Sequence, residues 1–360
     1  MANSARPLTI ALDAMGGDHA PRSVILGALD ALPSLSGARF IFFGDEAQIA
    51  PLLDSHPNLK AVSSIHHTTQ KVSGDDKPTA ILRNGKDTSM WLAIEAVAKK
   101  DADCIVSGGN TGALMVLGRK HLKMIPGIDR PAIATPMPTL RGQTIVLDLG
   151  ANVDCDPEHL VQFALMGAVY AKAVLEIDNP TIGLINVGEE EQKGNDLVRK
   201  TAKLLREFEL PGRFVGFIEG NDIGKGSVDV AVTDGFTGNV LLKTAEGTAA
   251  FVKGVIKNTA KDSLLNKFLM LLAVPLLLRI RKKIDPRFYN GAMFVGLGGI
   301  CVKSHGSMDH KGFGNAIKVA ANLVTHRFNE TVAAELEAHH IDSQNLAQNL
   351  AEKKLEEAAA

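Results

Sequence analysis

Five polar side chains stand in glycine-rich loops, where they could act on an anion. Lys193, Lys303 and His305 can carry positive charge, and Asn152 and Asn221 can donate hydrogen bonds through their amides. Such groups neutralise a bound anion or stabilise an oxyanion formed during a reaction. Taken singly, Lys193 also fits a solvated charge at a helix start, and His305 a hydrogen-bonded loop residue. We predict that these five side chains are catalytic.

The loops themselves favour an anion site, because glycine lets backbone N–H groups approach an anion closely. Tight turns explain any one loop. Seven such loops in one chain indicate a shared cradle: LDAMGGD, VSGGN, LDLGAN, NVGEEEQKGN, IEGND, VTDGFTGN and LGGICVKSHG. The residues predicted to bind substrate are Asp13, Gly16, Gly17, Gly108, Gly109, Asn110, Thr111, Gly112, Gly150, Gly194, Asp234, Gly235, Thr237, Gly238 and Asn239.

Motifs for several other chemistries are missing. The run from Gly220 to Gly226 has the wrong spacing for a P-loop, and the glycines at 296–299 do not continue as GxGxxG. No GxSxG nucleophile elbow occurs, and no histidine has an Asp five positions on. Free phosphate needs none of these, because its dianion is already a nucleophile that requires positioning and charge neutralisation. A thioester is a matching electrophile.

The elements that must position the loops alternate between strand and helix. Strand-like runs too short for helices lie at residues 8–12, 40–43, 104–107, 144–149 and 181–187. Helical spacing starts at Pro21, Ser89 and Pro157, with Asp156 as the N-cap of the third helix. This alternation predicts a three-layer α/β/α fold with a mostly parallel sheet. Because the carboxyl ends of parallel strands share one edge, we expect the loops to form one site there.

Composition restricts the class of protein further. The 360 residues are 45% hydrophobic and 22% charged with a formal net charge of -1, which indicates a folded globular chain without general attraction to nucleic acid. Cys104, Cys155 and Cys301 have neither zinc-ligand nor disulfide-framework spacing, so we expect a reducing cytoplasm and no metal. The N-terminus enters a strand pattern at once and has no signal-peptide pattern.

Six motifs, in order, resemble those of the PlsX family of phosphate acyltransferases. They are DAMGGDHAP at 13–21, SGGNTGA at 107–113, DLGAN at 148–152, NVGEEEQKGN at 186–195, DGFTGN at 234–239 and KSHGS at 303–307. The resemblance spans roughly residues 8–330. It implies a fold similar to the isocitrate/isopropylmalate dehydrogenase and phosphotransacetylase group, and a homodimer.

The resemblance also implies a reaction that uses no cofactor. Members of the family convert acylated acyl carrier protein and inorganic phosphate to acyl-phosphate and free carrier protein, and the product feeds the first acylation of glycerol 3-phosphate. On this reading Lys193 and loop amides hold phosphate, whereas Asn152 and Asn221 orient the substrate or the oxyanion. Lys303 and His305 neutralise charge or assist the leaving thiol.

One apolar segment, FLMLLAVPLLL at 268–278, is followed by a basic cluster. It is too short to span a bilayer, which takes about 20 helical residues. It suits either a hairpin lying in the interface of an anionic membrane or a buried core helix or dimer contact, and the basic cluster could instead meet an acidic carrier protein. The resemblance favours the membrane. The predicted membrane contacts are Leu271, Leu272, Leu276, Leu277, Arg279, Arg281 and Lys282.

We therefore predict one α/β unit over residues 1–335, with a hydrophobic hairpin inserted at about 255–287, and a helix or tail at 336–360. The expected location is the cytoplasm, with peripheral association at the inner face of the membrane beside the membrane glycerol-3-phosphate acyltransferase.

Three alternatives stay open. A phosphotransacetylase-like enzyme acting on acyl-coenzyme A would share the fold and the chemistry. A decarboxylating dehydrogenase would need NAD and a divalent metal, for which Asp13, Asp18, Asp148 and Asp234 are conceivable ligands, although turns explain them more simply. A non-catalytic membrane-surface scaffold for lipid enzymes would need none of these side chains.

Overall fold

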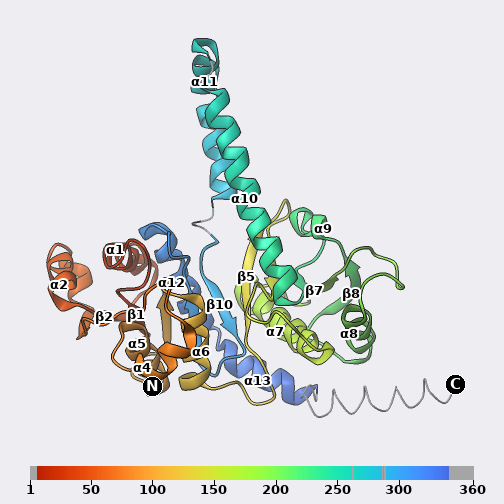
Figure 1. The fold of residues 1–360 in the computed structure, drawn as a ribbon, viewed down its shortest axis with the longest axis horizontal. Coiled ribbons are helices and arrows are strands. Elements are labelled where there is room, and N and C mark those ends of the chain that lie inside the picture. Colours follow the sequence, from red (N-terminus) through yellow and green to blue (C-terminus); the bar gives the residue numbers. More distant parts are fainter. Residues whose placement is uncertain (1–5, 262, 286, 288, 340–360) are drawn as a thin grey trace, which may run out of the picture.

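The computed structural model describes residues 6–261, 263–285, 287 and 289–339. The strands in this part of the chain are β1 (Thr9–Asp13), β2 (Arg39–Gly44), β3 (Ser63–His67), β4 (Cys104–Ser107), β5 (Ala132–Pro138), β6 (Gln143–Leu147), β7 (Thr181–Ile185), β8 (Arg213–Ile218), β9 (Val230–Val232), β10 (Ala292–Val295) and β11 (Ile300–Lys303). They form one sheet in the order β3-β2-β1-β4-β11-β10-β5-β6-β9-β7-β8. Figure 1 shows this sheet crossing the molecule with helices around it.

The helices in the described residues are α1 (Arg22–Ala31), α2 (Glu46–Asp54), α3 (Pro57–Lys60), α4 (Pro78–Asn84), α5 (Ser89–Ala98), α6 (Thr111–Leu122), α7 (Pro157–Leu175), α8 (Asp196–Glu207), α9 (Gly220–Lys225), α10 (Gly235–Thr259), α11 (Leu264–Ile284), α12 (His310–Thr325) and α13 (Phe328–Ala338), with a 3-10 helix η1 (Leu32–Ser34). Alternate side chains of β1 belong to two different hydrophobic cores, one on each face of the sheet. Ile10 and Leu12 pack with α1, α7 and α12 on one face, whereas Ala11 packs with α5 and α6 on the other. The predicted α/β fold with a mostly parallel sheet is confirmed.

Local patterns predicted these elements closely. Each of the five strand-like runs overlaps a strand of the sheet, and helices begin at Arg22, Ser89 and Pro157. Asp156 is the N-cap of α7, and its backbone N–H donates to Nδ1 of His159 at 2.9 Å. A carboxylate before a first-turn proline therefore marked this helix start correctly.

The expectation that all the loops share one edge is wrong. The pairings β11–β10, β10–β5 and β5–β6 are antiparallel, so β6, β7, β8 and β9 run opposite to β1, β4 and β11. Two of these three pairings are hairpins, with turns at residues 139–142 and 296–299, whereas the third joins β10 to β5, which are far apart in the chain. The carboxyl ends of the two groups of strands consequently lie at opposite edges of the sheet.

Helices α10 and α11 project away from the sheet together (Figure 1). The predicted insertion at about 255–287 begins inside α10, which is continuous from Gly235. Leu271, Leu272 and Leu276 of α11 are exposed, as is Arg279. Leu277, Arg281 and Lys282 belong to α11, but their side chains lie outside the described part of the chain. The predicted tail falls largely in residues 340–360, which are also outside it.

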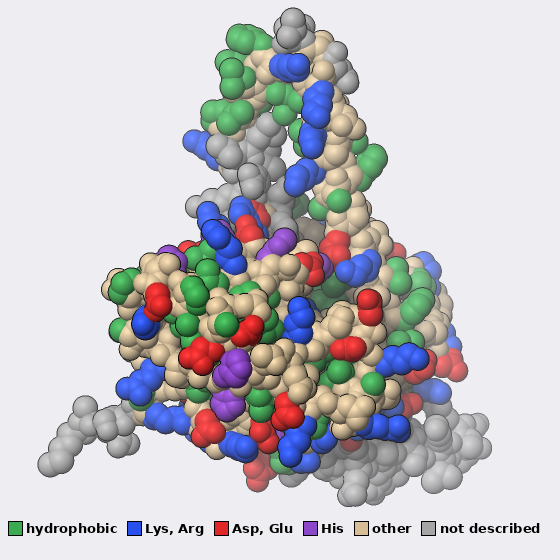
Figure 2. Space-filling model, turned by 60° about the vertical axis from the view of Figure 1, so that its left-hand side comes forward, with side chains coloured by type: hydrophobic (Ala, Val, Ile, Leu, Met, Phe, Trp, Pro, Cys, Tyr) green, Lys and Arg blue, Asp and Glu red, His purple; other side chains and the backbone are tan. Residues whose placement is uncertain are grey.

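None of the described helices combines the length and the apolar content that crossing a membrane requires. Figure 2 shows hydrophobic side chains beside Lys and Arg on the projecting helices.

Candidate functional site

Three loops meet at the carboxyl ends of β1, β4 and β11, and we call them the first glycine cluster: residues 13–18, 107–110 and 303–307. The Asp18 N–H donates to the Gly306 carbonyl at 2.9 Å, and the Ser304 N–H donates to the Ser107 carbonyl at 2.9 Å. Gly16 must lack a side chain here, because a Cβ atom would lie 2.8 Å from the Gly109 nitrogen. Asp13, Gly16, Gly17, Gly108, Gly109, Lys303 and His305 are thus brought together as predicted from their loops.

A buried carboxyl group anchors this cluster. Asp13 is 1% exposed and accepts hydrogen bonds of 2.6 Å from the hydroxyls of both Ser89 and Ser107. Burial raises the pKa of Asp13, and the two serine hydroxyls oppose that rise. Sequence reasoning missed Ser89, which starts α5 and stands outside every glycine loop. Ser107 precedes Gly108 in a recognised motif, so it could have been found.

Lys303 brings the positive charge to the first glycine cluster. Its Nζ donates to the Gly108 carbonyl at 3.3 Å and also to the Ser304 carbonyl. Burial lowers the pKa of Lys303 to about 8, and the nearby carboxyl groups of Asp13 and Asp18 oppose the shift. A lysine held against backbone carbonyls in this way is mostly charged at pH 7 and loses its charge as the pH rises through about 8.

His305 follows in the same loop and is exposed. Its Nδ1 lies 3.0 Å from the Ser307 hydroxyl, and its backbone N–H donates to Oδ1 of Asn290 at 2.9 Å. Desolvation lowers the pKa of His305, and Glu246 of α10 opposes the shift. The lowered pKa favours the neutral form of the imidazole at pH 7.

The start of α6 lies next to Gly108 and Gly109. Oδ1 of Asn110 accepts from the Ala113 N–H at 3.0 Å, and its Nδ2 donates to the carbonyls of Gly74 and Asp76. The Asn110 side chain thereby caps the start of α6 and links it to the loop that contains Gly74 and Asp76. Thr111 and Gly112 form the first turn of α6, where free backbone N–H groups and the helix dipole favour an anion.

The loop 148–152 and the start of α10 form a second cluster at the opposite edge. The buried Asp148 carboxyl accepts from the backbone N–H groups of Ile133, Gly150, Ala151 and Asn152. Nδ2 of Asn152 donates to the Pro131 carbonyl at 2.7 Å and to Asp148 at 2.9 Å. Both amide hydrogens are engaged, so Asn152 stabilises the loop here and does not offer a donor to an oxyanion.

The first turn of α10 completes this second cluster. Asp234 accepts from the backbone N–H and the hydroxyl of Thr237, at 2.9 and 2.8 Å, which occupies both side chains in helix capping. The Gly235 N–H donates to the Asn152 carbonyl at 2.7 Å. Gly238 packs against the backbone of Asp148, and Asn239 is exposed beside Gly150. The sequence-predicted residues of this group are close together but separate from the first glycine cluster.

Lys193 lies in a third loop, after β7. Its Nζ lies 2.8 Å from the Glu190 carboxylate, and this hydrogen bond raises the pKa of Lys193. Both side chains are about half exposed, at 45% and 52%. Gly194 follows with a φ of +92° beside Asn186. Asn221, in α9, is exposed. Lys193 thus forms an ion pair with Glu190 at the surface of this structure. It is not part of the first glycine cluster, which contains Lys303.

Helix α10 connects the first and second clusters. Its residues Lys243 and Glu246 lie close enough to His305 to influence the histidine pKa, while its N-cap is Asp234. Along a helix, residues 234 and 246 are about 18 Å apart. Within the described residues, no group of three or more His, Cys, Asp or Glu side chains could hold a metal ion. The first glycine cluster combines a lysine, a helix terminus and glycine amides, and such an arrangement can bind an oxyanion.

The order of the strands and the helices on both faces define a class of fold. It is similar to the EutD phosphotransacetylase from Staphylococcus aureus, with a TM-score of 0.58 and 16% identity over 88% of this chain and 94% of that chain. A phosphotransacetylase from Streptococcus pyogenes has a TM-score of 0.58 and 17% identity, over 89% of this chain and 94% of that chain. At such identities the likeness concerns the fold alone.

Closer relatives define the family. The family model described as "Fatty acid synthesis protein" matches residues 8–331. The phosphate acyltransferase of Rhodospirillum centenum is 56% identical over 327 residues, which cover 91% of this chain and 92% of that protein. That of Paramagnetospirillum magneticum is 53% identical over 330 residues, covering 92% and 94%. The chain belongs to the fatty acid synthesis protein family, and the resemblance to PlsX is confirmed.

Proposed function

We propose that this protein is a phosphate acyltransferase that takes its acyl group from acylated acyl carrier protein. The chain is an enzyme that transfers acyl groups to phosphate, as the names of its relatives indicate. One observation carries the proposal: Lys303 is held next to the Gly108 and Gly109 loop and the start of α6. This combination suits an unlinked phosphate dianion, because it offers charge and backbone donors without a nucleotide-binding motif.

The reaction follows from the chemistry of the two substrates. Lys303 and the glycine-loop N–H groups bind phosphate and orient one of its oxygens toward the thioester carbonyl carbon. The C–O bond forms first and gives an oxyanion, which backbone donors stabilise. The C–S bond then breaks, and the sulfur leaves with the electron pair as a thiolate that takes a proton from solvent. The products are acyl-phosphate and the free thiol.

An assay with two donors tests the proposal. Purified protein is given palmitoyl-carrier protein or palmitoyl-coenzyme A, with and without phosphate, and acyl-phosphate is trapped as its hydroxamate. We expect phosphate-dependent product with a kcat/KM at least about tenfold higher for the carrier-protein thioester. A preference for coenzyme A would favour the phosphotransacetylase-like alternative. Absence of product from both donors would leave the scaffold alternative.

The projecting helices support a proposed membrane contact. Leu271 and Leu272 are 67% and 63% exposed on α11, and Arg279 follows on the same helix. Exposed leucines near basic residues suit an inserted hydrophobic hairpin lying in an anionic membrane interface. The same location would bring the acyl-phosphate product to the membrane glycerol-3-phosphate acyltransferase.

Charged substitutions test this contact. The double variant Leu271→Asp/Leu272→Asp should bind vesicles of anionic phospholipid at least about tenfold more weakly, because two apolar side chains lose their burial in lipid. Co-sedimentation measures binding, and circular dichroism checks the fold. The matched control is Leu140→Asp, because Leu140 is 88% exposed on the β5–β6 turn. Unfolding of the double variant would instead support a packed role for α11.

We further propose that the enzyme acts as a cytoplasmic homodimer that associates peripherally with the inner face of the membrane. The resemblance to PlsX supports this assembly. Light scattering of the purified protein would give a monomer mass if the dimer proposal is wrong.

A further inference from the structure

The loop that carries Lys303 and His305 is held by one buried side chain, Asn290, which precedes β10. Nδ2 of Asn290 donates to the Ser304 hydroxyl and to the Gly312 carbonyl, both at 2.8 Å. Its Oδ1 accepts from the His305 N–H at 2.9 Å. Asn290 is 8% exposed and Ser304 is fully buried. One amide therefore links the residue between Lys303 and His305 to the start of α12.

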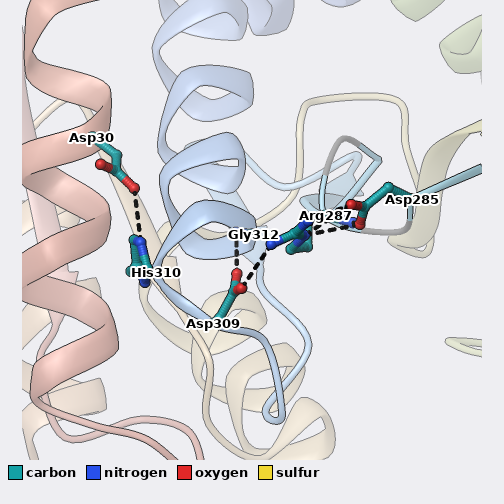
Figure 3. A network of polar contacts seen from close by, with 6 residues as sticks. All are labelled: Asp30, Asp285, Arg287, Asp309, His310 and Gly312. Carbon is teal, nitrogen blue, oxygen red and sulfur yellow. Dashed lines mark hydrogen bonds and ion pairs between the residues drawn. The ribbon is translucent and has the colours of Figure 1, made fainter. Parts of the chain in front are cut away.

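A second attachment lies at the other end of the same loop. Arg287 contacts Asp285 at 2.5 Å and Asp309 at 3.1 Å, and Asp309 in turn accepts from the Gly312 N–H at 3.1 Å (Figure 3). The next residue, His310, lies 3.5 Å from Asp30 of α1 (Figure 3). The segment that follows α11 thus contacts the loop from Ser304 to Asp309 at both of its ends.

We propose that Asn290 is a positioning residue for the phosphate acyltransferase reaction, which sets the place of Lys303 and His305 by holding Ser304 and the His305 amide. The inference rests on the proposed function. Asn290 acts through these residues and is not itself a catalytic group. His305 and Ser307 of this loop are exposed, and contacts with solvent alone do not fix the position of a loop. The loop therefore needs an anchor such as Asn290.

Steady-state kinetics provide the first test. Asn290→Ala should raise KM for inorganic phosphate at least about tenfold, because the lysine that binds phosphate is no longer held, and should change KM for the acyl donor less than about threefold. The matched control is Asn329→Ala. Nδ2 of Asn329 donates to the Leu297 carbonyl at 2.9 Å and so holds the far end of the same β10–β11 hairpin. The control should lower thermal stability without this change in KM.

The titration of Lys303 provides a second test that needs no enzyme activity. Asp13 and Asp18 face the Lys303 amine, and His305 is the nearby titratable group of its own loop. Burial lowers the pKa of Lys303 to about 8. A loop released by Asn290→Ala admits water, so this pKa should rise by about one unit or more toward its ordinary value. Labelling of amines with acetic anhydride across pH, read by peptide mass spectrometry, gives the midpoint.

Ser304→Ala removes the same hydrogen bond from the loop side and carries the test if Asn290→Ala does not fold. A midpoint that rises in either variant, but not in Asn329→Ala, supports positioning. An unchanged midpoint and an unchanged KM for phosphate would overturn it, as would equal shifts in the control. If the unmodified protein makes no acyl-phosphate, the proposed function is refuted, and a midpoint shift in Asn290→Ala would then show only that Asn290 holds Lys303 in its place.

Discussion

Replacing Lys303 by methionine is expected to lower kcat/KM for inorganic phosphate by about 100-fold or more. The loss has this size because a preorganised, desolvated donor to a reacting anion is removed, while methionine keeps most of the buried side-chain volume. Hydroxamate trapping at varied phosphate concentration measures the change. Retention of the fold is checked by circular dichroism and by the thermal midpoint.

The pH dependence of the unmodified enzyme follows from the same residue. Because the pKa of Lys303 is about 8, its ammonium form predominates below that pH and disappears above it. If the charged amine binds phosphate, kcat/KM for phosphate falls as pH rises through about 8. Lys303→Met should lack this descending limb. A variant with an unchanged limb would assign the titration to another group.

Lys193→Met is the matched control, since it removes a lysine from a different glycine-rich loop. Its ion pair with Glu190 is about half exposed, so we expect kcat/KM to fall about threefold or less. The opposite ranking of the two variants would restore Lys193 as the principal phosphate ligand.

Gly238→Ala is expected to destabilise the protein by about 3 kcal/mol or more. An added Cβ would overlap the Asp148 carbonyl oxygen and lie 2.9 Å from its carbon and 3.2 Å from Leu149 Cα. These are backbone atoms, which cannot rotate away as a side chain does. The free energy of unfolding from a denaturant titration measures the effect.

The control for this second prediction lies in the same helix. Gly247 of α10 is exposed and has no neighbour within 4 Å of an added Cβ. Gly247→Ala should therefore stabilise the protein by about 0.5–1 kcal/mol, because alanine loses less backbone entropy in a helix. Equal stability of both variants would mean that α10 does not pack against Asp148 in solution.

Sequence patterns predicted the local elements because their causes are local. The start of α7 follows from Asp156 and Pro157, and the short strands follow from β-branched and apolar runs. The directions of the strands could not be predicted in this way. They depend on the insertion of β10 and β11 between β4 and β5, which joins segments nearly 200 residues apart in the chain.

For the candidate site, too, the motifs predicted some features, and others could not be predicted from them. The motifs correctly grouped Asp13, Gly108 and Lys303, because each directly follows or ends a strand of one parallel group. The place of Asn152 depends on the distant carbonyl of Pro131, which no loop motif reveals. The exposure of the Lys193 side chain likewise depends on which other parts of the chain pack beside its loop, and the loop motif does not specify them.

Because β10 and β11 lie in the middle of the sheet, the sheet cannot be completed during synthesis until both strands have been made. Until residues 292–303 have left the ribosome, β4 and β5 each present an unpaired edge toward the other half. Such edges can pair with other chains. A product truncated before Ala292 would therefore be left with two incomplete sheets and a tendency to aggregate.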